Sequence, residues 1–335
     1  MSKTFGNEYI ILGGSGYFGS NFIYQKMRED ERSVIINIDL NEPAGFYPAN
    51  RLFWLKYDLA DEKNVNRIYR DILKVEHDLK VQKRILINFA AQSFVDRSIS
   101  SPEDTLMNNV NIVLNMLKLI ERMNCLVSMN LTKNDSFQVI HISTDEVHIL
   151  GKKDIRDVSA YALSKKICEE ILLKVSTSGN NMKKRVFKIV RPVNLYGVVS
   201  RRNADAYGLW QRNNCIITKL MKAVKNRSEQ MNLYLSESTR HFINIQRACG
   251  ILNKVILEEI DETKVYLMNY DFHIVIKDLI LSFIDRYSLT NVRLSNQNPR
   301  GRFEDDGYGI PEMKQNKQFE MDDFWNMMDL MVEEV

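Results

Sequence analysis

Short apolar runs alternate with amphipathic segments along the first part of the chain, up to about residue 197. Most of these runs are apolar at consecutive positions instead of at every second one. Such runs are typical of strands buried on both faces, so the pattern predicts an α/β fold with a doubly wound parallel sheet between layers of helices. The predicted strands are "EYIILGG", "SVIINID", "RLFWLKYD", "RILINFA", "SFQVIHIS" and "RVFKIVR".

The rhythm changes beyond Gly197, where a polar stretch is followed by short strands such as "MNLYL" and "KVYLMN" mixed with helices. This predicts a first domain over residues 1–197 and a smaller mixed α/β substrate-binding lobe over residues 198–335, partly interleaved with the first. The last predicted helix has one apolar side, which we expect to dock on the body of the protein. That side is formed by Phe324, Met327, Met328, Met331 and Val335.

Composition narrows the class of protein. The chain has 335 residues, 44% of them hydrophobic, and a net charge of +3 spread over 46 basic and 43 acidic residues. This is an ordinary globular composition that does not indicate a nucleic-acid partner. The four cysteines are far apart and have no neighbouring histidine, so we expect neither a metal site nor disulfides. No signal peptide or membrane-spanning run is recognised, so a cytoplasmic protein without a membrane partner is expected.

A glycine-rich segment, "LGGSGYFGSN", joins the first predicted strand to the first predicted helix. Gly13, Gly16 and Gly19 are spaced for a tight turn, close approach of the backbone to a pyrophosphate, and close packing of helix on sheet. Asp39 ends the second strand about 20 residues further on, where a carboxylate accepts hydrogen bonds from an adenosine ribose. That carboxylate would repel a 2′-phosphate, and no Arg or Lys follows it until Arg51. The segment therefore predicts a Rossmann-type domain that binds NAD rather than NADP.

Asp58 ends the third strand in "KYDLA" and has two interpretations. Its carboxylate could accept a hydrogen bond from the adenine amino group. It could equally be an N-cap or turn residue, and the sequence leaves both open.

The segment "YALSK" places Tyr161 and Lys165 four residues apart, on one side of a predicted helix. A free tyrosine has a pKa of about 10, which a lysine ammonium and the positive ring of an oxidised nicotinamide would both lower. The phenolate would take a proton from a sugar hydroxyl, with Thr144 sharing the hydrogen bond. Such a pair occurs by chance on many helices. Here it follows a dinucleotide turn and a Ser-Thr pair at a strand end, which favours a catalytic role.

Two adjacent acids, Asp145 and Glu146, follow Thr144 in "HISTDEVHIL". They could cap the next segment, lie in solvent, or give a substrate a proton donor and a proton acceptor. Consecutive side chains of a strand point to opposite faces. Both acids can therefore reach one cleft only if the backbone leaves strand geometry at Asp145.

Together, the glycine turn, "NFAAQSFVDRSI", "HISTDEV", "YALSK" and "RPVNLYG" resemble the extended short-chain dehydrogenase/reductase family, and within it the nucleotide-sugar 4,6-dehydratases. The resemblance runs from about Tyr9 to Gly250. Its most specific part is the Thr-Asp-Glu triplet, because the sugar epimerases of the family usually lack both acids. It implies NAD, a nucleotide-sugar substrate, and a homodimer formed through the helices near 103–123 and 159–175.

The resemblance also implies a catalytic cycle. Tyr161 deprotonates the sugar 4-hydroxyl while C4 gives up a hydride. Glu146 then removes the C5 proton, Asp145 protonates the departing 6-hydroxyl, and hydride returns to C6. Two close carboxylates suit these roles, because one negative charge raises the pKa of its neighbour.

Further site residues are implied by the same resemblance. Arg240 and Arg302 would pair with the substrate diphosphate, for which a guanidinium is well suited. The cofactor would also contact Tyr17, Phe18, Leu59, Ala90 and Ala91, and the substrate would also contact Ser93 and Asn194.

Several positions depart from the usual pattern of these dehydratases. Gln92 and Phe94 stand where Glu and His are usual, His148 replaces a usual tyrosine, and Asn214-Cys215 replaces a Glu-Lys pair. The segment between Glu146 and Tyr161 is also shorter. The dehydratases of large DNA viruses, which use UDP-sugars, resemble the chain in these departures. A less charged pocket favours UDP-N-acetylglucosamine, with UDP- or dTDP-glucose as the next choices. The alternatives are a UDP-hexose 4-epimerase and a non-catalytic NAD-binding sensor.

Overall fold

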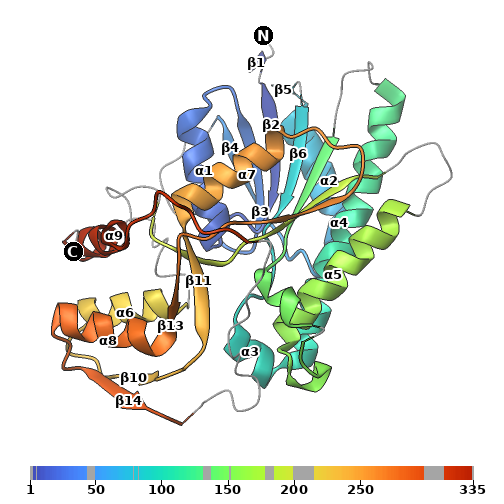
Figure 1. The fold of residues 1–335 in the computed structure, drawn as a ribbon. Coiled ribbons are helices and arrows are strands. Elements are labelled where there is room, and N and C mark those ends of the chain that lie inside the picture. The colour runs from blue at the N-terminus through green and yellow to red at the C-terminus, as the bar shows by residue number, and fades with distance from the viewer. Residues whose placement is uncertain are drawn as a thin grey trace.

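The computed structural model describes residues 3–4, 6–43, 50–77, 79–81, 83–130, 137–150, 152–177, 185–198, 215–297 and 313–333. Its main sheet has seven strands, all parallel, in the order β12-β8-β7-β6-β2-β3-β4 (Figure 1). The order reverses between β2 and β6, and ligands of doubly wound sheets bind at such a reversal. The predicted fold class is confirmed. The strands are β2 (Asn7–Leu12), β3 (Val34–Asp39), β4 (Leu52–Lys56), β6 (Lys83–Asn88), β7 (Phe137–Ile142), β8 (Phe187–Arg191) and β12 (Lys264–Leu267).

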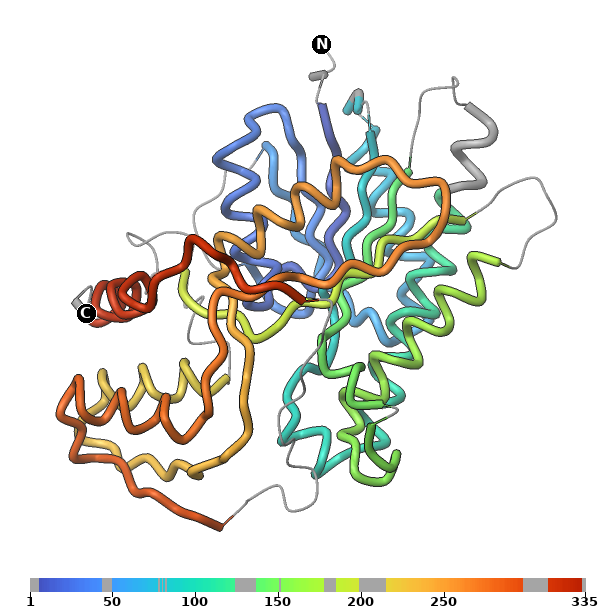
Figure 2. Tube along the Cα trace, in the orientation of Figure 1, coloured from blue at the N-terminus to red at the C-terminus, as the bar shows by residue number. Residues whose placement is uncertain are grey.

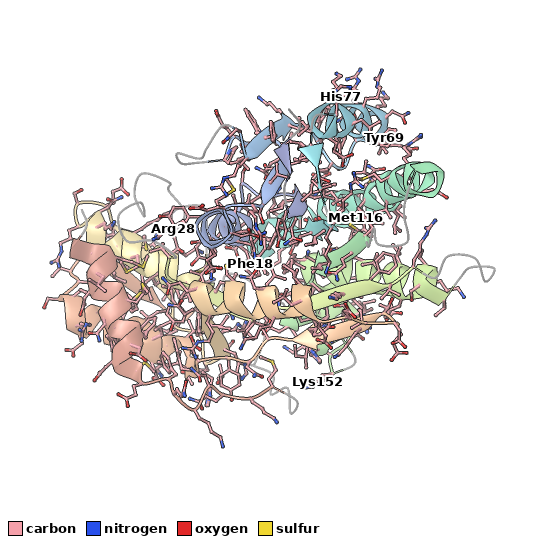
Figure 3. The ribbon with its side chains drawn as sticks, turned by 90° about the horizontal axis from the view of Figure 1, so that it is seen from above. Phe18, Arg28, Tyr69, His77, Met116 and Lys152 are labelled. Atoms are coloured by element: carbon pink, nitrogen blue, oxygen red, sulfur yellow. The ribbon has the colours of Figure 1, made fainter. Side chains whose placement is uncertain are left out.

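Helices cover both faces of this sheet. Viewed from above, Phe18 lies on one side of the sheet, and Met116 and Tyr69 lie on the other (Figure 3). The first face packs against α1 and α7, and the second against α2, α4 and α5. Strand residues alternate between these two cores, which explains why the strands are apolar at consecutive positions. The helices are α1 (Tyr17–Glu29), α7 (Ile245–Leu257), α2 (Val65–Glu76), α4 (Pro102–Asn130) and α5 (Ala160–Thr177).

A second, smaller lobe has its own apolar core. The C-terminal helix α9 (Met321–Glu333) buries Phe324, Met328 and Met331 in that core, which confirms the docking predicted from its apolar side, while Val335 lies outside the described residues. The remaining elements of the lobe are β9 (Asn194–Tyr196), α6 (Ile216–Lys225), β10 (Met231–Tyr234), β11 (Thr239–Asn244), β13 (Phe272–Val275), α8 (Ile276–Tyr287) and β14 (Val292–Ser295).

The two parts of the chain are interwoven in space. Although α7 and β12 come late in the sequence, α7 packs in the core beside α1, and β12 pairs with β8 at the edge of the main sheet (Figure 1). The division into residues 1–197 and 198–335 stays a prediction. The short elements are β1 (Lys3–Thr4), β5 (Leu79–Lys80), α3 (Val95–Ser100) and the 3₁₀ helices η1 (Glu62–Asn64), η2 (Asp145–Ile149) and η3 (Ile155–Asp157).

Two kinds of feature are absent from the described ranges, a membrane-spanning helix and a cluster of metal ligands. None of the helices there is long and apolar enough to cross a membrane. In the same ranges, no group of three or more His, Cys, Asp or Glu side chains is placed to hold a metal ion.

A buried acid lies at the amino end of β2, away from the edge where the strands finish. Glu8 is fully buried. The guanidinium of Arg84 forms ion pairs with two carboxylates, since Arg84 Nε lies 3.2 Å from Glu8 Oε2 and 3.1 Å from Glu76 Oε1. Burial and the neighbouring Glu76 raise the pKa of Glu8 well above its ordinary value, and Arg84 offsets this only in part. Glu8 therefore binds a proton more tightly in the folded protein than in the unfolded chain.

We expect Glu8→Gln to stabilise the protein at neutral and higher pH. The pKa of Glu8 is higher in the folded protein than in the unfolded chain, where it is about 4.3. Proton binding at Glu8 therefore contributes its full stabilisation below that unfolded pKa, and this contribution is lost as the pH rises through the pKa of the folded protein. The amide cannot ionise and Arg84 keeps its ion pair with Glu76, so the gain in free energy of unfolding over the wild type should grow to roughly 1 kcal/mol or more above pH ~7. Thermal unfolding between pH ~5 and ~8 measures this, with the exposed Glu42→Gln as control. A difference in free energy of unfolding between Glu8→Gln and the wild type that stays constant across that pH range would contradict this prediction.

Candidate active site

The predicted site residues converge on one edge of the main sheet. The strands β2, β6 and β7 are parallel neighbours, and the loops at their carboxyl ends carry the glycine turn, the "AAQSF" segment and the two acids. The small lobe lies on this side of the sheet (Figure 2). The edge includes the reversal of strand order, so it is the candidate active site.

The glycine turn is tightly packed on one side and open on the other. Gly13 has a φ of +75°, and a Cβ there would lie 2.5 Å from the backbone of Ala90. A Cβ at Gly19 would lie 2.7 Å from Gly14 Cα. By contrast, the nearest described atom to a Cβ at Gly16 would be Gly13 O, at 3.5 Å. The first turn of α1 has neither a side-chain cap nor an acidic residue, so its N–H groups suit the negative pyrophosphate of NAD.

We expect Gly13→Ala to weaken NAD binding by at least about tenfold, because alanine is strained at this φ and its methyl group would push Ala90 away from the turn. Titration calorimetry with NAD measures the affinity. The matched control is Gly250→Ala, since a Cβ at Gly250 in α7 meets nothing within 4 Å among the described atoms. Equal NAD affinity of both variants would contradict this role of the turn.

Two side chains of β3 support the glycine turn. Gly14 N donates to Asn37 Oδ1 (3.0 Å), and Ser15 N donates to Asp39 Oδ2 (2.9 Å). The Asp39 carboxylate therefore lies beside the turn, where the ribose contact was predicted. Arg51, the first cation after it, donates instead to two carbonyls at the end of α1. Asn37 was not predicted as part of the site, although an amide within an apolar strand was a signal for it.

The strand β4 ends at Lys56, so Asp58 and Leu59 lie in the loop after it, and the prediction that Asp58 ends the strand is wrong by two residues. Asp58 Oδ1 accepts from Ala60 N (2.9 Å), which fits the turn interpretation, and the adenine contact stays a prediction. Leu59 O accepts from Asn115 Nδ2 of α4 (3.0 Å).

The other predicted cofactor residues lie around the glycine turn. Ala90 lies against it and Ala91 follows, partly exposed. Phe18 is buried, with its ring 5.1 Å from that of Phe89. Tyr17 turns its phenol toward the small lobe, where its hydroxyl donates to Gly197 O (2.5 Å). Cofactor contacts of Tyr17 and Phe18 would therefore use their backbone N–H groups.

Thr144 and Tyr161 are brought together from separate elements. Thr144 follows β7 and Tyr161 lies in the first turn of α5, and their side chains share a hydrogen bond that lowers the pKa of the tyrosine. Burial, Glu146 and Asp145 act in the opposite direction and raise this pKa above its ordinary value. The protein alone thus disfavours the phenolate. The predicted lowering of this pKa stays a prediction, and it depends on the positive ring of the bound cofactor.

Lys165 lies beneath this pair. It is buried, and its Nζ donates to Ile142 O at the end of β7 (2.7 Å). Burial lowers its pKa to about 8, an effect opposed by the neighbouring Glu169 carboxylate.

The chain leaves strand geometry at Asp145, as the sequence analysis requires for both acids to serve one cleft. Asp145 begins the 3₁₀ helix η2, and Thr144 Oγ1 caps it by accepting from Glu146 N (3.3 Å). Asp145 is buried and Glu146 is partly exposed, and both carboxylates act electrostatically on the phenol of Tyr161. Phenol, hydroxyl and two acids therefore form one cluster. Such a cluster can move protons to and from a bound polyol.

The predicted substrate residues lie at the rim and on the small lobe. Ser93 is exposed in the loop after β6. Asn194 of β9 donates its amide to His241 O (3.1 Å), and Arg240 lies partly buried on the neighbouring β11. Arg302 lies outside the described residues. The roles of all four stay predictions.

One further polar residue holds the loop after β6. Asn109 of α4 is buried, accepts from Gln92 N (2.7 Å), and donates to Gln92 O (3.0 Å) and Ser164 Oγ (2.8 Å). It thus ties the loop to the helix that carries Tyr161. The feature that could have identified Asn109 is a buried amide on the side of a helix that packs in the core. The Gln92 side chain accepts from Phe94 N (2.5 Å) and donates to Phe94 O (3.1 Å) and Thr105 Oγ1 of α4 (3.1 Å).

The chain was compared with known proteins. The model of the NAD dependent epimerase/dehydratase family matches residues 9–215. A dTDP-glucose 4,6-dehydratase from Xanthomonas campestris pv. campestris (strain B100) is 30% identical over 147 residues, which cover 42% of this chain and 38% of that protein. One from Mycobacterium tuberculosis (strain ATCC 25618 / H37Rv) is 28% identical over 142 residues, covering 42% and 37%. The matched part is thus well under half the length of these relatives.

Solved structures share the fold over nearly the whole chain. The dTDP-glucose 4,6-dehydratase of Bacillus anthracis str. Ames, in complex with NAD, has a TM-score of 0.67 at 17% identity, covering 98% of this chain and 96% of that one. The UDP-glucose 4-epimerase of Thermotoga maritima, with UDP-glucose, also has a TM-score of 0.67, at 14% identity and 98% coverage of both chains. At such identities the likeness shows the fold alone.

Proposed function

Because the chain belongs to the NAD dependent epimerase/dehydratase family, we propose that it is a nucleotide-sugar 4,6-dehydratase, which makes an NDP-4-keto-6-deoxyhexose. NAD is the cofactor of this chain, as the family description gives. The observation that carries the proposal is the cluster at the end of β7. There Thr144 Oγ1 donates to Asp145 Oδ1 (3.3 Å) and accepts from Glu146 N (3.3 Å), and both acids act on the phenol of Tyr161.

The first group of residues serves oxidation at C4. When bound, NAD would supply the hydride chemistry needed for oxidation at C4 and reduction at C6. Tyr161 takes the proton of the 4-hydroxyl, and Thr144, which shares a hydrogen bond with it, orients that hydroxyl. Lys165 supplies positive charge beneath the site and favours the phenolate.

The second group serves loss of water across C5 and C6. A ketone at C4 acidifies the C5 proton, which Glu146 removes as the base. Asp145 donates a proton to the departing 6-hydroxyl. Asp145 is the more buried of the two, and burial favours the neutral, proton-donating form of a carboxyl group.

The substrate proposed first is UDP-N-acetylglucosamine, with UDP-glucose and dTDP-glucose as alternatives. Three positions that are usually charged in the similar dehydratases are Gln92, Asn214 and Cys215. The Gln92 side chain is held by hydrogen bonds to Phe94 and Thr105. A pocket with fewer charges suits a neutral acetamido group. Contacts of Arg240 and Arg302 with the diphosphate and of Ser93 and Asn194 with the substrate belong to the same proposal.

A UDP-hexose 4-epimerase is the second candidate. It would use Thr144, Tyr161 and Lys165 in the same way, and the fold matches the epimerase from Thermotoga maritima as well as it matches the dehydratases. Mass spectrometry after incubation with each of the three nucleotide sugars tests the proposal. A product one water lighter supports the dehydratase, whereas an isomer of unchanged mass identifies the epimerase.

A homodimer is also proposed, formed through α4 and α5. Met107 and Leu114 lie two turns apart on one side of α4, and these residues are 64% and 39% exposed. Light scattering tests this, since a dimer has twice the chain mass of 39.2 kDa and a monomer does not.

A further inference from the structure

A chain of polar side chains joins η2, β8 and α5 beside the candidate active site. Arg191, the last residue of β8, places its Nε 2.8 Å from Glu169 Oε1 and a terminal nitrogen against Glu169 Oε2. Its other terminal nitrogen lies 2.9 Å from His148 Nε2. Glu169 is fully buried and the Arg191 side chain is only 13% exposed, so this ion pair is shielded from water, while His148 is partly exposed. We call His148, Arg191 and Glu169 the polar bridge.

The direction of the histidine hydrogen bond follows from chemistry. A guanidinium has only N–H donors, so His148 Nε2 must accept, and its ring proton is on Nδ1. The planar fork of Arg191 gives two hydrogen bonds to one carboxylate and has a third donor left for the imidazole.

The ends of the polar bridge reach the two groups of residues that the proposed reaction uses. His148 lies on η2, two residues after Glu146. Glu169 lies one turn beyond Lys165 on α5 and acts on its charge. In the middle, Arg191 precedes Pro192, whose carbonyl accepts from Asp145 N (3.0 Å).

The helix η2 depends on such contacts. A 3₁₀ helix of five residues has little intrinsic stability, because its hydrogen-bond geometry is poor. Its cap is the long hydrogen bond of 3.3 Å from Glu146 N to Thr144 Oγ1. The hydrogen bond from Arg191 to His148 anchors its other end.

We propose that His148 is a positioning residue for water elimination, which through Arg191 and Glu169 holds η2, and with it Glu146, in place against the helix that carries Tyr161. This inference rests on the proposed function. It predicts that His148 affects elimination much more than C4 oxidation, since Tyr161 and Lys165 keep their own contacts without it.

The test compares His148→Phe, which cannot accept, with His148→Gln, which can accept through its amide oxygen. With UDP-N-acetylglucosamine and NAD, the Phe variant should form NADH at nearly the wild-type rate and deoxy sugar about 10- to 100-fold more slowly. The Gln variant should restore most of the elimination. His77→Phe, at the end of α2, controls for loss of an imidazole (Figure 3). Equal losses of elimination in the Phe and Gln variants, or no loss in the Phe variant, would overturn the inference.

Hydrogen exchange of the peptide covering residues 142–150 tests the anchoring without any turnover. Exchange should be about tenfold faster in the Phe variant and unchanged in the Gln variant. Unchanged exchange in the Phe variant would overturn the anchoring. If the wild type formed no deoxy sugar, the proposed function would fail, and the exchange comparison alone would then decide the role of the polar bridge.

Discussion

Replacing Tyr161 by Phe should abolish C4 oxidation and, with it, every later step. The phenol is the group placed to take the 4-hydroxyl proton, and phenylalanine keeps the ring while losing the oxygen that Thr144 contacts. Loss of a general base that also starts the reaction should lower product formation about a thousandfold or more. Stopped-flow absorbance of NADH, with product mass measured in parallel, should show neither NADH nor deoxy sugar.

A matched control separates this effect from the loss of any phenol. Tyr69→Phe changes a partly exposed tyrosine on α2, outside the candidate active site (Figure 3). It should leave both signals at wild-type level. NADH formation by Tyr161→Phe at a rate near that of Tyr69→Phe would remove Tyr161 from the proposed mechanism.

Replacing Glu146 by Gln should stop the reaction after C4 oxidation and before the loss of water. The amide has the shape of the carboxylate, and the backbone N–H of residue 146 still donates to Thr144, so η2 should keep its cap. Without a base for the C5 proton, we expect NADH to form while deoxy sugar formation falls about a hundredfold or more. The combination of retained oxidation and lost elimination distinguishes a C5 base from a residue that only supports the fold.

Two further variants complete this comparison. Asp145→Asn should also retain NADH formation and slow the loss of water, since it removes the proton donor. The exposed Glu103→Gln, at the start of α4, should change neither step. Normal deoxy sugar formation by Glu146→Gln would show that Glu146 is not the C5 base.

Much of the fold follows from local patterns. Each apolar run predicted in the first part became a strand of the main sheet, because strands covered on both faces are apolar at every position. The places of α7 and β12 could not be predicted in this way. Their local pattern fits either lobe, and only the pairing of β12 with β8 and the packing of α7 beside α1 decide it.

The candidate site was predicted as a set of residues, and its geometry needed the structure. The spacing of the glycines, together with the Tyr161 and Lys165 pair that follows them in the chain, predicts a chemistry for these residues. The turn at Asp145 has no periodic signal, because it depends on the carbonyl of Pro192, which is far away in the sequence. The polar bridge could not be predicted for the same reason, because His148, Arg191 and Glu169 meet only in the folded chain.

The most direct measurement of the proposed reaction follows one labelled hydrogen. UDP-N-acetylglucosamine with deuterium at C4 is incubated with the wild-type enzyme and NAD, and the product is examined by NMR and mass spectrometry. A 4,6-dehydratase should give a 4-keto sugar one water lighter, with deuterium in the new methyl group at C6. A product of unchanged mass that carries the deuterium at C4 would contradict the assignment and identify an epimerase.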